Sequence, residues 1–290
     1  MRFARILVPL DGSRLAEAVL PAVRSLGQKL GATALLLHVM EREPPTAVHG
    51  EPHLCDEQDA LTYLERRAAE LRRDGIAAES HVHGRPVDDV APAVDQHAHE
   101  FGADLIAMCA HGRSNLRTRL VGSIAERILR GGSVPILLRT VQRADVPAFD
   151  LRKLLVPVDF HHDVDAALDA ARTLAPRYGA AVTLLAALEP PAPETSRLLP
   201  ATSALMRDYE LDDLDRRLAG LADRLRSDLP EVRAVVADQP PTDAIVAALP
   251  ADLIVLVTDA HAGLASWYDP STGQQLLKRP DLTLLLIREL

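Results

Sequence analysis

Short apolar runs alternate with longer amphipathic segments along the chain. The clearest runs, 5–10 (RILVPL) and 34–39 (ALLLHV), have the length and composition of strands that are buried on both faces of a sheet. Apolar residues recur at helical spacing over 15–30, and the charged stretch 57–73 also predicts a helix. The predicted strands of the first half are 5–10, 34–39, 78–82, 105–108 and 134–138. This alternation predicts a parallel sheet with right-handed crossovers.

Capping and turn residues set the predicted ends of several elements. Ser13 has a side chain that favours the start of the first helix, and Gly31 favours its end. The segment 84–86 (GRP) is predicted to turn the chain into a helix that runs to about Glu100. Because proline lacks a backbone N–H, that helix is predicted to break near Pro92.

The second half of the chain repeats the first. The segment RILVPLDGS at residue 5 returns as KLLVPVDFH at residue 153. Four more matches follow in the same order and at nearly the same offset, pairing 31–32 with 179–180, 34–43 with 182–191, 103–106 with 251–254, and 134–139 with 282–288. Matches this regular indicate two copies of one domain.

The repeat predicts an α/β fold of two tandem Rossmann-like domains, each with a mostly parallel five-stranded sheet flanked by helices. We expect the first domain to span 1–144 and the second 150–290. The stretch between them, around 141–150 (VQRADVPAFD), is short and polar, as expected of a linker.

A loop rich in glycine and arginine follows the fourth predicted strand. The chain is predicted to turn tightly at 110–112 (AHG), and Gly122–Ser123 opens a short helix. A helix N-terminus attracts anions, and glycine lets the backbone approach them closely. Arg113, Arg117 and Arg119 lie between these points and can supply bidentate donors for phosphate. Although no Walker sequence occurs, the pattern predicts a nucleotide phosphate site.

Three further positions are predicted to lie beside that loop. Asp11 follows the first strand, Val39 ends the second and Cys109 follows the fourth. Ligands of open parallel sheets bind at the carboxyl ends of the strands, so these residues converge only if the three strands are neighbours. Two interpretations of Asp11 stay open: it caps the following helix, or it contacts ribose hydroxyls, the adenine amino group or Mg²⁺.

Charge and cysteine content narrow the class of protein. The net charge of −9 argues against nucleic acid as the main partner, since that partner requires a cationic face. Two cysteines, Cys55 and Cys109, predict no disulfide scaffold and fit a reducing cytoplasm. Cys109 follows a buried strand and is interpreted as an inert small residue. We find neither a signal peptide nor an apolar run of membrane-spanning length, and therefore expect a cytoplasmic protein that does not bind membranes.

Other histidines and cysteines give only weak indications of a metal site. His49, His53 and Cys55 have spacings that could ligate zinc, but no fourth ligand is evident, so no metal site is predicted. His81 and His83 alternate along one strand face and are predicted to be exposed rather than ligating.

Together these features resemble the universal stress protein family in its tandem form. The family marker is G-x-x-G, nine residues, then G-[ST]. The chain carries Gly112, nine residues and Gly122–Ser123, with AHGR at the marker and similar VPLDGS and VPILLR segments. The resemblance covers nearly the whole chain. One departure is Cys109, which stands at the first glycine of the marker; its side chain either narrows the approach to the phosphates or is tolerated.

The resemblance implies a domain of the adenine nucleotide alpha hydrolase-like type that binds ATP or AMP, with or without Mg²⁺. Asp11 and the backbone at Val39 would meet the adenosine. The implied nucleotide-binding residues are Pro9, Asp11, Val39, Cys109, His111, Gly112, Arg113, Gly122 and Ser123. The resemblance also implies that the two domains pair as an intramolecular pseudo-dimer, commonly through the last strand. A further homodimer and an unidentified protein partner stay open.

The two copies differ in the loop that carries this chemistry. AHGRSNLRTRLVGS in the first copy corresponds to AHAGLASWYDPSTG in the second. In this alignment Gly112 corresponds to Ala262 and Gly122 corresponds to Thr272. The loop arginines are absent from the second copy. We predict one nucleotide-competent site, in the first copy.

Three functions stay open. The favoured one is a stress-response regulator that binds an adenine nucleotide without turnover. The second is a slow ATP hydrolase, for which only Asp11 and His111 are candidate catalytic groups. The third is an interaction protein that needs no nucleotide. His111 recurs as His261 in the copy that lost its loop, which favours a turn or packing role over a catalytic base.

Overall fold

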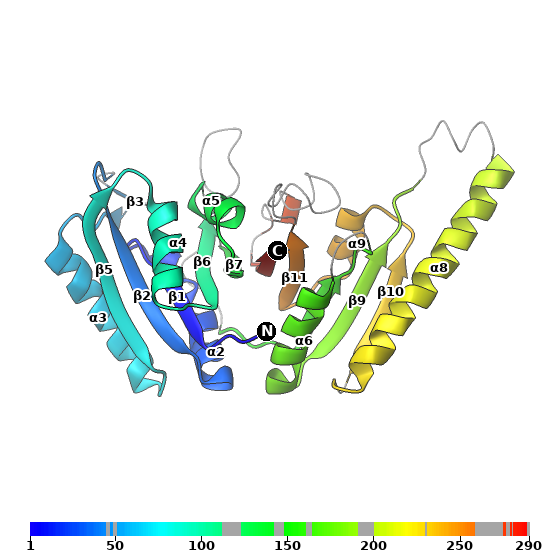
Figure 1. The fold of residues 1–290 in the computed structure, drawn as a ribbon, viewed down its shortest axis with the longest axis horizontal. Coiled ribbons are helices and arrows are strands. Elements are labelled where there is room, and N and C mark those ends of the chain that lie inside the picture. The colour runs from blue at the N-terminus through cyan, green and yellow to red at the C-terminus, as the bar shows by residue number, and fades with distance from the viewer. Residues whose placement is uncertain are drawn as a thin grey trace. The chain divides into compact units, whose positions relative to one another are not determined.

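The computed structural model describes most of the chain. The described residues are 1–44, 47–48, 51–111, 123–141, 148–160, 164–190, 200–229, 231–258, 275–276, 279 and 281–288. They form two compact units, the first made of Met1–Asp150 with Thr258–Leu290 and the second of Leu151–Val257 (Figure 1). Among the described residues, no helix is both long enough and apolar enough to cross a membrane.

The first unit is a mostly parallel sheet flanked by helices. Its elements are β1 (Arg5–Pro9), α1 (Arg14–Glu17), α2 (Leu20–Leu30), β2 (Thr33–Glu41), β3 (Ala47–Val48), β4 (Glu51–Pro52), α3 (Glu57–Arg73), β5 (Ala78–Val87), α4 (Val90–Glu100), β6 (Leu105–His111), α5 (Ser123–Gly131), β7 (Ile136–Val141) and β12 (Thr283–Arg288). The strands follow the order β5-β2-β1-β6-β7-β12. All neighbouring pairs are parallel except β7 and β12, which are antiparallel.

The second unit repeats the parallel part of this arrangement. Its elements are β8 (Lys153–Pro157), α6 (Asp165–Tyr178), β9 (Ala181–Ala187), α8 (Pro200–Arg226), β10 (Val232–Ala237), α9 (Pro241–Ala247) and β11 (Leu253–Thr258). The four strands run parallel in the order β10-β9-β8-β11. The predicted α/β class and the mostly parallel sheets are therefore confirmed.

The last strand of the chain completes the sheet of the first unit. Thr283 pairs with Arg139 and Leu286 with Ile136, in antiparallel register. The hydroxyl of Thr140 donates to Arg279 O over 2.8 Å and accepts from Leu282 N over 2.9 Å. Because of this pairing, a segment from the second sequence repeat belongs to the first unit.

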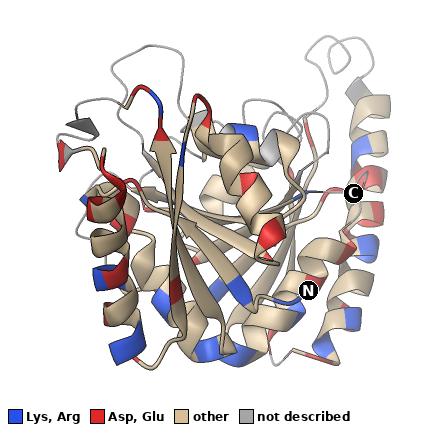
Figure 2. Cartoon of the chain, turned by 60° about the vertical axis from the view of Figure 1, so that its left-hand side comes forward, with Lys and Arg blue, Asp and Glu red and all other residues tan. Residues whose placement is uncertain are grey.

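The cores are aliphatic, as expected from the few aromatic residues. In β2 every residue from Ala34 to Met40 is buried, which is typical of a central parallel strand with both faces covered. Lys, Arg, Asp and Glu lie mainly on helices and at strand ends (Figure 2).

The two units contain equivalent polar contacts at corresponding positions. Asp104 accepts hydrogen bonds from the backbone N–H groups of Ala4 and Arg5 at 2.8 and 2.9 Å, ahead of and at the start of β1. Asp252 accepts the same pair of bonds before and at the start of β8, at 2.9 and 2.8 Å. Gly31 and Gly179 both end a helix in the left-handed conformation, at φ 71° and 68°. The repeated sequence therefore repeats in structure.

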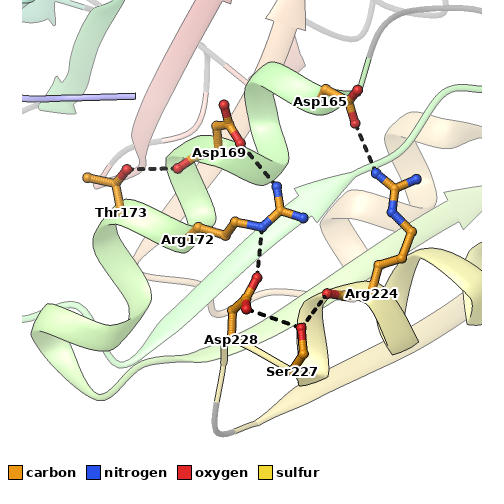
Figure 3. Close-up of polar contacts among 7 residues, drawn as sticks. All are labelled: Asp165, Asp169, Arg172, Thr173, Arg224, Ser227 and Asp228. Carbon is orange, nitrogen blue, oxygen red and sulfur yellow. Dashed lines mark hydrogen bonds and ion pairs between the residues drawn. The ribbon is translucent and has the colours of Figure 1, made fainter.

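Ion pairs between the helices on one face of each sheet are also repeated. In the first unit Arg24 Nε lies 2.6 Å from Asp74 at the end of α3. In the second unit Arg172 Nε lies 3.2 Å from Asp228, just after α8 (Figure 3). Arg224 of α8 also contacts Asp165 of α6 at 3.2 Å (Figure 3).

Three local predictions were wrong. The predicted helix 15–30 is divided into α1 and α2, because Pro21 in the first turn of α2 has no N–H to continue an earlier helix. The segment 84–86 is not a turn but the last part of β5 before Val87. Pro92 does not break α4, since the first turn of a helix does not use the missing N–H.

Strand β6 is also longer than predicted. It continues to His111, so Ala110 and His111 belong to the strand and do not form the expected turn. The helix expected after Gly122 is present as α5, which begins at Ser123.

Candidate functional site

The candidate site lies where the strand order of the first unit reverses. Strand β1 lies between β2 and β6, so the chain builds the sheet outward from β1 first in one direction and then in the other. The condition that the first, second and fourth strands are neighbours is met. Such a switch point is where open parallel sheets bind ligands.

The two strands at this point separate toward their carboxyl ends. In the described residues, β1 pairs with β6 only at Ile6↔Leu105 and Leu7↔Ile106. Beyond these, β1 stays with β2 up to Pro9, and β6 stays with β7 as far as His111. The divergence opens the end of the sheet where the predicted residues lie.

Asp11 is held in the turn after β1. Its Oδ1 accepts a hydrogen bond from the backbone N–H of Ser13 over 2.8 Å. The buried Ser13 side chain in turn accepts from Ala16 N over 3.1 Å, as the predicted N-cap of α1. Asp11 therefore supports the turn, while Ser13 caps the helix.

A distant segment covers the same turn. Gly12 has a φ of +91°, and a Cβ added to it would lie 2.8 Å from Leu54 Cγ. Arg14 N donates to Glu51 Oε2 over 2.6 Å, which fixes the segment beside the start of α1. Gly12 is therefore required for both its backbone conformation and this close approach.

Val39 and His38 are neighbours in β2, near the end of β1. Val39 is buried within β2, two residues before the strand ends at Glu41. The neighbouring His38 is also buried, and its Nδ1 lies 2.8 Å from the carbonyl oxygen of Leu10. This histidine contact was not predicted, because it depends on a backbone atom of Leu10, which follows β1 and is far from His38 in sequence.

Cys109 is a buried thiol on β6. Burial raises its pKa to about 12; the positive charge of Arg139 opposes that shift and the negative charge of Asp11 adds to it. Cys109 pairs in register with Arg139 of β7, whose Nη1 donates to Ala18 O over 3.3 Å. The thiol is protonated at neutral pH, in agreement with its interpretation as an inert residue.

Much of the predicted phosphate loop lies outside the described residues. This applies to Gly112, Arg113, Gly122 and to the two further loop arginines, Arg117 and Arg119. His111 is described only as the last residue of β6, and Ser123 only as the first residue of α5.

The helix that follows the loop is fastened to α4. Arg127 Nη1 of α5 lies 2.7 Å from Asp89, the N-cap of α4. The structure places Pro9 at the end of β1, Asp11 in the turn between β1 and α1, and Cys109 on the neighbouring strand β6.

A polar cluster beside Asp11 was missed by sequence reasoning. Tyr63 of α3 is buried, and that burial raises the pKa of its hydroxyl well above its usual value, with smaller contributions from Glu17 and Asp11. Arg67 Nη1 lies 3.6 Å from Glu17 of α1 and 2.9 Å from Glu70. Nothing in the local sequence pairs α1 with α3, so no signal could have identified it.

The histidines considered as metal ligands lie in the segment before α3 and on β5. His53 Nε2 contacts Glu41 Oε1 at 3.2 Å, while His49 lies outside the described residues. His81 is exposed as predicted, but His83 is partly covered by α4. The described part of the chain contains no group of three or more His, Cys, Asp or Glu residues arranged to hold a metal ion.

The equivalent turn in the second unit carries a bulky aromatic side chain. Asp159 corresponds to Asp11, but Phe160 stands in the place of Gly12. The guanidinium carbon of Arg217 lies 4.1 Å from the centroid of the Phe160 ring. Ala262 and the rest of the second loop lie outside the described residues.

Comparisons with known proteins agree on one family. The model of the universal stress protein family matches twice, at residues 2–138 and 150–288. Universal stress protein YxiE of Bacillus subtilis is 26% identical over 149 residues, which cover 47% of this chain and 98% of that protein. Universal stress protein MJ0577 of Methanocaldococcus jannaschii is 28% identical over 152 residues, covering 47% and 94%.

Solved structures share the fold over the full length. A universal stress protein from Archaeoglobus fulgidus aligns with a TM-score of 0.69 at 19% identity, covering 99% of both chains. A putative universal stress protein from Pseudomonas aeruginosa aligns with a TM-score of 0.63 at 17% identity, covering 99% of this chain and 93% of that one. The chain therefore belongs to the universal stress protein family, with two copies of the family's domain in tandem.

Proposed function

We propose that this protein binds an adenine nucleotide, ATP or AMP, at the switch point of the first unit and acts as a regulator in the stress response. The observation that carries this proposal is the separation of β1 from β6 beyond Leu7 and Ile106, with Asp11 in the turn that follows β1. Membership of the family and the glycine spacing around Gly112 and Gly122 support the same site.

Asp11 is suited to the nucleoside rather than to the phosphates. Its Oδ1 accepts from Ser13 N, so the carboxylate is held in one orientation. A carboxylate repels phosphate oxygens, whereas it accepts hydrogen bonds from ribose hydroxyls or the adenine amino group and binds Mg²⁺. We assign Asp11, with Pro9 and the backbone of Val39, to the adenosine.

The phosphates belong at the start of α5. Ser123 begins this helix, and the unpaired N–H groups of a helix N-terminus favour anions. In this proposal the phosphate path consists of Cys109, His111, Gly112, Arg113, Gly122 and Ser123. The Cys109 thiol is neutral at physiological pH, so it adds bulk but no negative charge to that path.

We assign one site to each chain. In the second unit, the stacked side chains of Phe160 and Arg217 occupy the turn that corresponds to Gly12. The second loop also lacks the arginines of the first. Binding without turnover is favoured because phosphoryl transfer requires an orienting base and a metal-clamping set, for which the sequence offers only Asp11 and His111.

The test is the nucleotide content of freshly purified protein, followed by calorimetric titration with Mg-ATP and AMP. We expect about one nucleotide per chain, which is lost in Gly122→Val because a Cβ branch blocks the backbone from the phosphates. Thr272→Val, a nearly isosteric change at the corresponding position of the second loop, is the matched control and retains binding. Two nucleotides per chain would contradict the single site. No bound nucleotide and no heat of binding would overturn the proposal.

A further inference from the structure

Helix α8 is longer than its counterpart in the first unit. It has 27 residues, whereas α3 has 17. The two helices correspond at their C-terminal ends, where Arg72 Nε donates to Ala78 O and Arg226 Nε donates to Val232 O, six residues on in both cases. The additional residues of α8 therefore lie at its N-terminal end, over 200–210.

This N-terminal extension is fastened to the sheet on one side. The side chain of Arg207 donates from Nη1 to Glu189 O over 2.7 Å and from Nη2 to Leu188 O over 2.9 Å, just after β9. Its Nε also donates to Asp238 over 2.7 Å, just after β10. These contacts fix the rotation of the helix, so the side facing away from Arg207 is presented to solvent in one orientation.

The outward side carries three large apolar residues. Leu205 is 71% exposed, Met206 59% and Tyr209 66%, and they are the most exposed large hydrophobic side chains among the described residues. With about 3.6 residues per turn, positions 205 and 209 lie on the side of the helix opposite 207, and position 206 lies about 100° from 207, on the flank next to 209. Leu, Met and Tyr exposed together in two turns form an apolar surface for which the described part of the second unit supplies no cover.

Acidic side chains border this apolar surface. Asp208, Glu210 and Asp212 are exposed, and within the described residues none of them forms an ion pair. Arg207 is neutralised by Asp238, and the next two arginines of the helix, Arg216 and Arg217, are already near Asp213. The rim of the apolar surface is therefore negatively charged.

We propose that this face of α8, made of Leu205, Met206, Tyr209, Asp208, Glu210 and Asp212, docks a basic amphipathic helix of another protein. The three apolar side chains bury against the apolar side of the partner, and Lys or Arg residues beside it meet the acidic rim. A second copy of this chain is disfavoured, because two acidic rims would face one another.

The test uses the full chain and a fluorescent amphipathic peptide of about 18 residues, made of Leu and Lys at helical spacing so that it is long enough to form a helix. We expect saturable binding that weakens with salt. Replacing the apolar trio by serine (Leu205→Ser, Met206→Ser, Tyr209→Ser) should weaken it at least about tenfold, as for an interface hot spot. Asp208→Asn, Glu210→Gln and Asp212→Asn together should weaken binding and flatten its salt dependence.

Two controls distinguish binding at this surface from non-specific binding of the peptide. Leu61→Ser removes an exposed leucine from α3, the counterpart helix, and should leave binding unchanged. The same peptide with Glu in place of Lys should not bind. The proposal is overturned by no binding of the Lys peptide, by equal binding of the serine variant, or by equal binding of the Glu peptide. It is also overturned if sedimentation shows a wild-type dimer that the serine variant abolishes, since the occupant would then be a second copy.

Discussion

His83 Nδ1 of β5 lies 2.9 Å from His97 Nε2 of α4, so two imidazoles share one hydrogen bond between a strand and the helix that covers it. The ring of His81 packs edge-on against His97, with centroids 4.7 Å apart, and Phe101 stacks on it at 5.2 Å. His97 Nδ1 lies 2.9 Å from Glu100 Oε2. Burial lowers the pKa of His97, His81 and His83 lower it further, and Glu100 opposes the shift.

The first prediction concerns stability against pH. Because the pKa of His97 is lower in the folded than in the unfolded chain, the unfolded chain binds more protons once the pH falls below about 6.5, the ordinary histidine value. The free energy of unfolding should therefore decrease from about pH 6.5 down to the folded-state pKa and level off below it. Urea unfolding between pH 8 and pH 5 measures this slope. His97→Gln should flatten it, whereas His99→Gln, an exposed change on the same helix, should not.

The second prediction concerns Gly12 and its contact with Leu54. Gly12→Ala should destabilise the fold by at least about 2 kcal/mol, because the new Cβ meets Leu54 and the backbone is left-handed. Gly102→Ala isolates the backbone contribution, since Gly102 has a φ of +60° with nothing within 4 Å, and should cost about 1 kcal/mol. Chemical unfolding gives both values. Equal losses in the free energy of unfolding for the two variants would show that Leu54 moves aside without destabilising the fold.

A third prediction follows from the anchoring of α8 by Arg207. Arg207→Ala removes the donors to Leu188 O and Glu189 O, so the N-terminal extension should lose its fixed position. Hydrogen exchange should accelerate over 200–210 while the rest of α8 keeps its protection. The control is Arg224→Ala. Arg224 also belongs to α8, and the substitution removes its surface ion pair with Asp165 of α6. Unchanged exchange over 200–210 would mean that Arg207 does not hold the extension.

The two cysteines should differ in reactivity. Cys55 is exposed, whereas Cys109 is buried and its pKa is raised to about 12. Since the thiolate is the reactive form, iodoacetamide at pH 8 should label one cysteine rapidly in the native protein and both after denaturation. Mass spectrometry of Cys55→Ser identifies which thiol reacts. Rapid labelling of that variant would contradict a buried, protonated Cys109.

Local sequence signals predicted elements whose ends depend on nearby residues. The helix at 57–73 was predicted with its observed bounds, because its charge pattern is local and Asp56 caps it. The segment 84–86 was misread because glycine and proline usually mark turns. Strand β5 accommodates them since it is an edge strand, and proline is tolerated where one side of a strand has no partner.

The sequence located candidate site residues at the carboxyl ends of individual strands, but it did not show which of those strands are neighbours. Asp11 and Cys109 were expected at carboxyl ends, but their proximity depended on a strand order that only the structure gives. The contact of Leu54 with Gly12 and the stacking of Arg217 on Phe160 join residues far apart in sequence. No spacing or periodicity encodes such contacts, because they arise when separate elements pack together.

The pairing of β12 with β7 has a consequence for how the chain is made. During synthesis the first repeat leaves the ribosome before the second, but the strand that covers the outer edge of β7 follows the second repeat. Until then β7 presents unpaired N–H and C=O groups, which invite pairing with another nascent chain. The sheet that is begun first is thus completed only after the second repeat has been made, and premature termination before β12 would leave the first unit without one of its strands.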